Sequence, residues 1–304
     1  MSIAVGRREA RRPLETPTLA LAAIIYGGWL ALTWTWSDLP LWLALPAAGW
    51  LLAWHNSLQH EAVHGHPTGR PRIDAVIAGL PLGLWLPFPI YRASHLAHHG
   101  TAFLTDPFDD PESYYVDHGA WQRMSRVHRW LLRAMQTVLG RLLVGPPVVI
   151  VRLFASEARL VARGDLWRLR TWAQHIILCA GVLAWVVGVC GIPLWLYLAA
   201  FVYPGLALTL LRSFIEHRPA AEQVARSALV EAGPVFSLLY LNNNLHALHH
   251  AAPQIPWYQL PGIYRETRAA LLRRNRGFRY GGYLEVVRRF ALRGKDSPVA
   301  GEGP

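Results

Sequence analysis

Three short clusters of histidine carry the clearest chemical signal in this sequence. They read HEAVH at residues 60–64, HLAHH at 95–99 and HALHH at 246–250. Side chains three and four positions apart share one face of a helix, with Cβ atoms about 5–6 Å apart. One helical turn can therefore offer two or three imidazole nitrogens to the same metal centre. The eight candidate ligands are His60, His64, His95, His98, His99, His246, His249 and His250.

These clusters predict a site for more than one metal ion. Neutral imidazole suits Fe, Zn, Cu and Ni. A closed zinc site takes four ligands, whereas eight imidazoles are enough for two metals. The only cysteines, Cys179 and Cys190, do not form a cluster, which excludes cysteine-ligated iron–sulfur chemistry. Iron is favoured because imidazole ligands leave it open positions for dioxygen.

Four long apolar segments must position the clusters. The chain has 304 residues, of which 53% are hydrophobic. The segments are 18–36, 39–58, 172–191 and 193–214. Each has about the 20 residues needed to cross a hydrocarbon layer roughly 30 Å thick, and only a short turn separates the members of each pair. We therefore predict four transmembrane helices in two tight hairpins.

The positive charge predicts the orientation of these helices. The chain holds 30 Lys and Arg and has a formal net charge of +11, yet neither hairpin turn contains a cation. By the positive-inside rule, both termini and the segment between the hairpins are cytoplasmic, with all three clusters on that side. The charge also favours contact with anionic membrane lipids. A more specific interpretation is the docking of an acidic redox partner. Nucleic-acid binding is excluded because no recognition motif accompanies the arginines.

We interpret residues 1–304 as a single all-α membrane domain, with a cytosolic helical cap that holds the metal site. Residues 74–90 are apolar but broken by prolines, so we expect them to be interfacial or re-entrant. The segments are a basic leader (1–17), the first hairpin (18–58), a cytosolic and interfacial part (59–171), the second hairpin (172–214), a second cytosolic part (215–293) and a disordered tail (294–304).

The three clusters resemble the histidine boxes of the membrane fatty acid desaturase and hydroxylase superfamily. Two features extend the resemblance, DDPES at 109–113 and EHR at 216–218. The resemblance implies four membrane helices under a cytosolic cap that holds two non-haem iron ions, with O₂ as co-substrate. It also makes His217 a ninth ligand, and no catalytic residue is expected beyond the metal centre. Ser213 departs from the asparagine found there in some desaturases.

Residues that support the ligands are also expected near the clusters. Metal-bound imidazoles usually donate their second N–H to a carboxylate or carbonyl group. Glu61 lies within the first cluster but points off the ligand face, which favours a structural role. The candidates for support are Asp106, Asp109, Asp110, Glu112, Glu216, Asn242, Asn243 and His66.

The expected reaction is O₂-dependent oxidation of a C–H bond in a fatty acyl or related lipid chain, with desaturation as first choice. Hydroxylation, ketolation and oxidative decarboxylation are alternatives on the same scaffold. No flavin, haem or ferredoxin module is visible, so electrons would come from a separate carrier such as a ferredoxin. We expect a multi-pass protein of the bacterial inner membrane.

Two rival functions use the same histidines differently. A metal transporter would place its ligands near the bilayer midplane on broken helices, whereas these clusters follow helix ends. An interfacial zinc hydrolase would use HEAVH as an H-E-x-x-H motif, which leaves the other two clusters unexplained.

Overall fold

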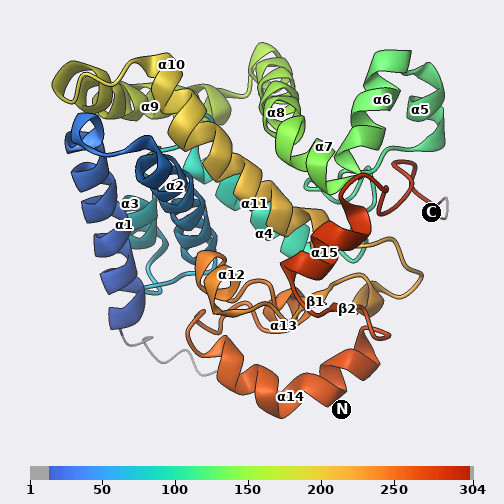
Figure 1. Ribbon diagram of the computed structural model, residues 1–304. Helices are drawn as coiled ribbons and strands as arrows, with labels where there is room; N and C mark the ends of the chain where they lie inside the picture. The colour runs from blue at the N-terminus through green and yellow to red at the C-terminus, as the bar shows by residue number, and fades with distance from the viewer. Residues whose placement is uncertain (1–13, 302–304) are drawn as a thin grey trace.

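The protein is mostly helical, as the sequence predicts (Figure 1). The computed structural model describes residues 14–301, so most of the predicted basic leader lies outside the described residues. One small addition to the all-α prediction is a parallel pair of two-residue strands, β1 (Leu229–Val230) and β2 (Arg279–Tyr280). Both strands lie within the second predicted cytosolic part, 215–293.

The first apolar pair forms a helical hairpin. Helix α1 (Thr16–Trp34) runs to a 3₁₀ turn, η1 (Trp36–Asp38), and helix α2 (Leu41–Val63) returns beside it. Proline is accommodated at the start of α1, where a missing N–H costs nothing. The two helices share an apolar cluster that includes Trp29 and Leu52.

Shorter helices follow. They are α3 (Pro71–Ala78), α4 (Phe88–Gly100), α5 (His118–Arg123), α6 (Arg126–Met135), α7 (Val138–Leu143) and α8 (Gly145–Ala162). The predicted interfacial stretch 74–90 does not form one helix, because its prolines leave an irregular loop between α3 and α4. In that loop the Leu82 side chain is fully buried, and its carbonyl accepts a hydrogen bond from Tyr197 at 2.8 Å.

The second apolar pair opens away from its turn. Helix α9 (Leu166–Leu183) continues into the π-helical segment η2 (Ala184–Val189). After the turn come α10 (Leu194–Tyr197), π-helical η3 (Leu198–Val202) and α11 (Tyr203–Glu216). Helix α11 packs against α2 and α7, whereas α9 packs against α8 and α4. The expected tight hairpin is therefore limited to the residues near its turn.

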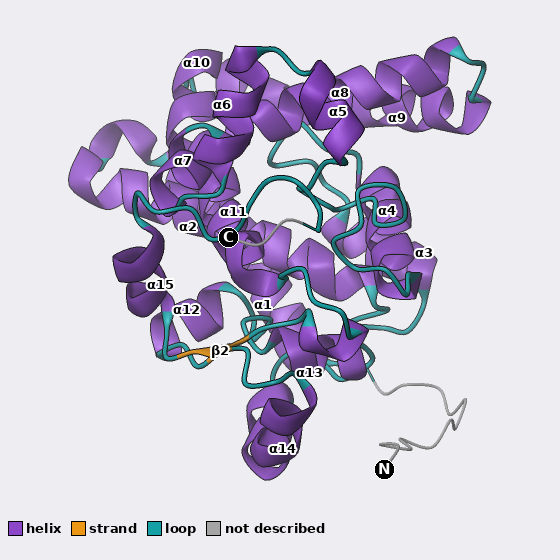
Figure 2. Cartoon of the chain, turned by 90° about the vertical axis from the view of Figure 1, so that its right-hand side faces the viewer, coloured by secondary structure: helices purple, strands orange, loops and turns teal. Residues whose placement is uncertain are grey.

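The remaining helical elements follow α11 in the chain, and one of them, α13, carries the third histidine cluster. They are η4 (Gln223–Ala225), α12 (Pro234–Leu239), α13 (His246–Ala251), α14 (Leu260–Arg274) and α15 (Tyr283–Phe290). Figure 2 shows α12, α13 and α14 on the side of the molecule opposite to α8 and α9.

Among the described residues, three helical segments are long and apolar enough to cross a membrane: Thr16–Trp34, Leu166–Val189 and Leu194–Glu216. The predicted fourth span, α2, is a helix of 23 residues, but it does not join this set. Its second half reads HNSLQHE and is almost wholly buried in the protein. Those polar residues lower the mean hydropathy of the helix. They are accommodated because they face the interior of the fold rather than lipid.

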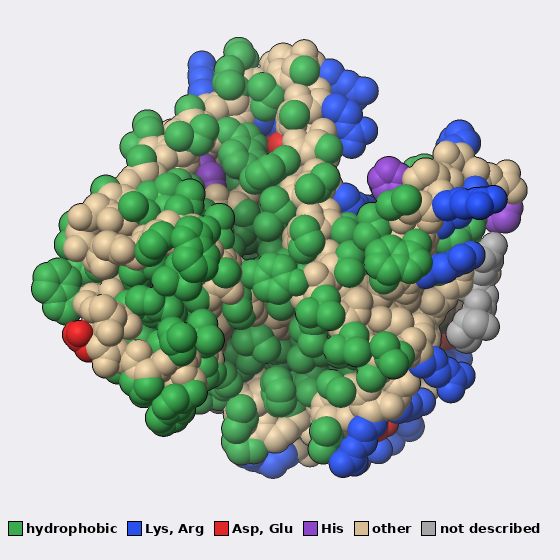
Figure 3. Space-filling view, turned by 45° about the horizontal axis from the view of Figure 1, so that its top comes forward, with side chains coloured by type: hydrophobic (Ala, Val, Ile, Leu, Met, Phe, Trp, Pro, Cys, Tyr) green, Lys and Arg blue, Asp and Glu red, His purple; other side chains and the backbone are tan. Residues whose placement is uncertain are grey.

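Large apolar side chains cover one broad face of the molecule, and Lys and Arg gather at its rim (Figure 3). Trp42, Ile177 and Trp195 are among the exposed residues, at 77%, 71% and 68%. A contiguous apolar surface of this kind is typical of a membrane-contacting face.

The tail is ordered where the structure describes it, so the prediction of disorder over 294–304 is wrong for 294–301. Its backbone pairs with Val116, which donates to Pro298 and accepts from Ala300. Val299 is buried, and Lys295 donates to the backbone carbonyl of His217 at 2.5 Å. The Ser, Pro and Gly content indicated disorder, but these tertiary contacts outweigh it.

Helices α2 and α11 are in close contact because glycine occupies the crossing point. A Cβ added at Gly205 would lie 2.4 Å from the Cβ of Leu52, and one at Gly49 would lie 2.9 Å from the Cβ of Pro204. Small residues allow two helix backbones to approach in this way. The crossing fixes His60, on α2, relative to His217 at the end of α11.

We expect Gly205→Ala to destabilise the protein by about 1–3 kcal/mol, the usual cost of overpacking a well-packed interior. Thermal unfolding in detergent measures the effect. The matched control is Gly181→Ala in α9, where an added Cβ meets nothing within 4 Å, so this variant should unfold no earlier than the original chain. Equal stability of the two variants would contradict the tight crossing.

Candidate metal centre

The structure brings the nine histidines of the sequence prediction into two adjacent groups. Within each group the candidate ligand atoms lie within 4.8 Å of one another. The first group is His60, His64, His95, His99 and His249, and the second is His98, His217, His246 and His250. Four separate elements therefore converge on one place: the end of α2, α4, the residue after α11, and α13.

The second and third clusters each divide between the two groups. His95 and His99, one helical turn apart on α4, belong to the first group, whereas His98 belongs to the second. On α13 the proportions are reversed: His249 belongs to the first group, whereas His246 and His250 belong to the second. Consecutive residues of an α-helix point about 100° apart, so neighbouring histidines address different points. The sequence spacing alone indicated one common centre for each cluster.

Ring nitrogens within the groups face one another at close range. The Nε2 of His217 lies 3.1 Å from that of His98 and 3.0 Å from that of His246. In the first group, the Nε2 atoms of His249 and His99 are 3.2 Å apart. Such convergence of nitrogen lone pairs is what a bound cation requires.

Carboxylates select the tautomer that metal binding needs. Asp110 accepts a hydrogen bond from Nδ1 of His98 at 2.7 Å, and Glu112 accepts one from Nδ1 of His95 at 3.1 Å. A neutral imidazole that donates from Nδ1 has its lone pair on Nε2. The Nε2 of His95 is buried and has no hydrogen-bond partner among the described residues. A metal ion fits this vacant acceptor.

Burial also favours the neutral form of several of the imidazoles. It lowers the pKa of His99 to about 3, and it holds the pKa values of His249 and His250 well below their usual range. The neighbouring imidazoles lower these pKa values further. Neutral imidazole is the form that coordinates metals.

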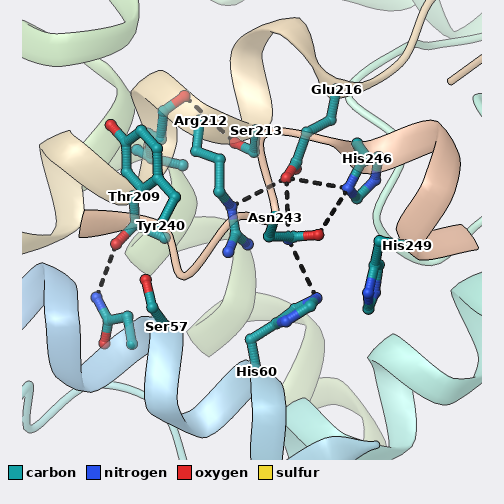
Figure 4. A network of polar contacts seen from close by, with 12 residues as sticks. Ser57, His60, Thr209, Arg212, Ser213, Glu216, Tyr240, Asn243, His246 and His249 are labelled. Atoms are coloured by element: carbon teal, nitrogen blue, oxygen red, sulfur yellow. Dashed lines mark hydrogen bonds and ion pairs between the residues drawn. The ribbon is translucent and has the colours of Figure 1, made fainter. Parts of the chain in front are cut away.

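Behind the second group lies a polar network (Figure 4). The Oε1 of Glu216 lies 2.9 Å from Nε of Arg212, 3.3 Å from Nδ1 of His246 and 3.3 Å from Nδ2 of Asn243. The Nδ2 of Asn243 also donates to Nε2 of His60 at 3.3 Å. Asn243 thus links the two groups, and Glu216 orients His246.

Sequence reasoning did not identify Arg212. It lies four residues before Glu216 in an otherwise apolar helix, and such a pair shares one helix face. An ionisable pair in an apolar segment is itself a signal for a functional site, so the spacing could have revealed it.

Four of the predicted supporting residues make other contacts. Asp106 accepts from backbone amides of its own loop, and Asp109 is exposed. Asn242 donates to the carbonyl of Trp257, and Nδ1 of His66 lies 2.5 Å from Glu15. These positions do not fit support of the histidine groups. Separately, Glu61 accepts from the backbone N–H of Trp257 at 3.1 Å, and its Oε1 lies 3.9 Å from Nδ1 of His60.

The contrast between Asp110 and Asp109 gives a matched test. Loss of a carboxylate that holds a ligating histidine typically costs 10–100-fold in metal affinity. We expect Asp110→Asn to weaken metal retention by about that factor, and Asp109→Asn to leave it unchanged. Chelator-competition titrations measure both. The same retention in the two variants would show that Asp110 does not orient His98.

A cavity of about 650 Å³ opens onto the histidines. His95, His98 and His217 line one part of it. Another part is lined by apolar side chains, among them Leu84, Trp85, Leu153, Leu206 and Leu210, and charged residues such as Arg141 and Arg152 also line the cavity. A cavity of this size and lining suits an elongated apolar ligand with one polar end.

Comparison with known proteins agrees with this chemistry. The model of the family "Fatty acid desaturase" matches residues 34–282. The chain is also similar to a beta-carotene ketolase from Paracoccus sp. (strain N81106 / MBIC 01143), with 29% identity over 275 residues that cover 82% of this chain and 92% of the relative.

Proposed function

We propose, from the premise that this chain belongs to the fatty acid desaturase family, that it oxidises C–H bonds of a lipid chain with O₂ at a di-iron centre. The family and the ketolase relative identify the chain as an oxidoreductase for lipid-like substrates. The observation that carries the finer proposal is the shared cavity, in which candidate ligands such as His95 and His98 meet apolar walls.

The two histidine groups would hold the iron ions, one in each group. Bound there, they would supply the activation of O₂ that breaking an unactivated C–H bond requires. The protein supplies position and a dry environment. Asp110 and Glu112 hold the imidazoles in place, and Leu206 and Leu210 keep water away from a chain in the cavity.

Desaturation is the first candidate outcome, because the family description names it. Ketolation is the second, because the similar Paracoccus protein is a beta-carotene ketolase. The two outcomes differ in composition: desaturation removes two hydrogens from the substrate, and ketolation replaces two hydrogens with one oxygen. Mass spectrometry of lipids from cells that express the chain distinguishes them.

The reaction needs an electron carrier. When O₂ is reduced to two water molecules during desaturation, the substrate provides two of the four electrons, and a carrier must provide the other two. We propose a ferredoxin-like carrier that approaches the exposed basic residues of α15, Arg288 and Arg289. Turnover with enzyme and O₂ alone would exclude an external carrier.

Metal identity and stoichiometry test the proposal first. The detergent-purified chain, expressed with added iron, is analysed by inductively coupled plasma mass spectrometry. Two Fe per chain supports the oxidative function, and lipid product analysis follows. One tightly held Zn, with no iron acquired anaerobically, would favour the interfacial zinc hydrolase instead.

A further inference from the structure

A buried arginine without a counter-ion lies in the wall of the same cavity. The Arg141 side chain, on α7, is 2% exposed. Its Nε donates to the carbonyl of Met135 at 3.1 Å, and its guanidinium carbon lies 3.9 Å from the ring centre of Tyr114. The Nη1 atom is buried and has no hydrogen-bond partner among the described residues.

The surroundings of Arg141 are positive. Within residues 14–301, no ion pair joins it to a carboxylate. Lys295 and Arg152 also line the cavity. The nearby carboxylate of Asp296 is already used, because it lies 3.0 Å from Nζ of Lys295 and accepts from the hydroxyl of Tyr115 at 2.6 Å. Burial lowers the pKa of Arg141, and Arg152 lowers it further.

An unpaired buried charge is costly, so such groups in proteins are paired or bind ligands. A guanidinium forms charge-assisted hydrogen bonds most readily with carboxylate and phosphate oxygens. The cavity connects Arg141 with the apolar walls at Leu206 and Leu210 and with the histidine groups. A neutral hydrocarbon would fill the apolar part but would leave Arg141 without a partner.

We propose that Arg141 binds the anionic head group, a carboxylate or a phosphate, of a lipid substrate whose chain extends along the apolar walls toward the histidines. This inference rests on the proposed function, since it names the class of lipid that the same cavity would accept. It assigns Arg141 as a specificity-determining residue for anionic lipids over neutral ones.

Binding to the metal-free protein tests the inference without turnover. Three probes with the same sixteen-carbon chain are compared by isothermal titration in detergent: palmitate, hexadecyl phosphate and hexadecanol. One charge-assisted hydrogen bond corresponds to a preference of about tenfold or more. We expect the original chain to bind at least one anionic probe that much more tightly than hexadecanol. The stronger anion identifies the head group as carboxylate or phosphate.

The variants separate the effect of the Arg141 charge from an effect on folding. Arg141→Met should lose the preference for the anion and keep hexadecanol binding, and Arg141→Lys should retain part of the preference. The control Arg163→Met, at an exposed position beyond the end of α8, should behave as the original chain. If Arg141→Met does not fold, Arg152→Met in the same wall should reduce the preference.

Equal affinity of the original chain for all three probes would overturn the inference, as would an unchanged preference in folded Arg141→Met. Failure of this inference and failure of the proposed function give different results. A clear anion preference in a chain that binds no iron would retain the subsite and reject the oxidase. Oxidation of neutral lipids by a chain without anion preference would do the reverse.

Discussion

Replacement of His98 or His249 by alanine is expected to abolish lipid oxidation and to lower the bound iron. Each variant removes one member of a different histidine group, so together they test both. Both side chains are buried, and a methyl group cannot replace the lost nitrogen. Iron content per chain and product formation in the presence of an electron carrier are the measurements.

The control for these variants is His118→Ala, at the exposed start of α5. It should retain both iron and activity. Full iron content with full turnover in His98→Ala and His249→Ala would remove the assignment of these histidines as ligands. Loss of activity with full iron in both would instead place them in substrate positioning.

Glu216→Ala should cause the largest loss of stability. The substitution leaves Arg212, 6% exposed, as an uncompensated buried charge, which typically costs about 3–5 kcal/mol. It also removes the acceptor that faces His246 and Asn243. We expect a large decrease in thermal stability together with weaker metal retention, measured in detergent on the same preparation.

Two further variants make this test specific. In the double variant Arg212→Met/Glu216→Met both charges are gone, so it should unfold later than Glu216→Ala, because replacing both members of a buried pair by apolar residues costs little. Glu222→Ala breaks the exposed pair with Arg276 and should change stability little. If Glu216→Ala were no less stable than Glu222→Ala, the buried pair would not support the site.

The sequence pointed to the nine histidines that the structure brings together, eight through the cluster spacings and His217 through the family resemblance. The spacings did not predict how these histidines divide between the two groups. The supporting residues were partly predictable. Asp110 and Glu112 follow α4 closely in the chain, but Asp109 is their neighbour in sequence and faces solvent. Only the packing of the loop distinguishes them.

Features that depend on distant contacts were not predictable. Arg141 is buried and packs on the ring of Tyr114, which lies outside its own helix, and nothing in that helix indicates this. The predicted membrane span at α2 illustrates the same limit. Its apolar first half indicated lipid, but the fold uses its second half to bring His60 into the site.

The division of neighbouring histidines between two groups has a mechanical consequence. His98 and His99 follow one another on α4 and serve different groups, and His249 and His250 do the same on α13. A rotation of either helix therefore moves candidate ligands of both groups at once. The two histidine groups thus cannot be adjusted separately. The spacing between two bound ions would be set by the rotation of both helices rather than by either ion alone.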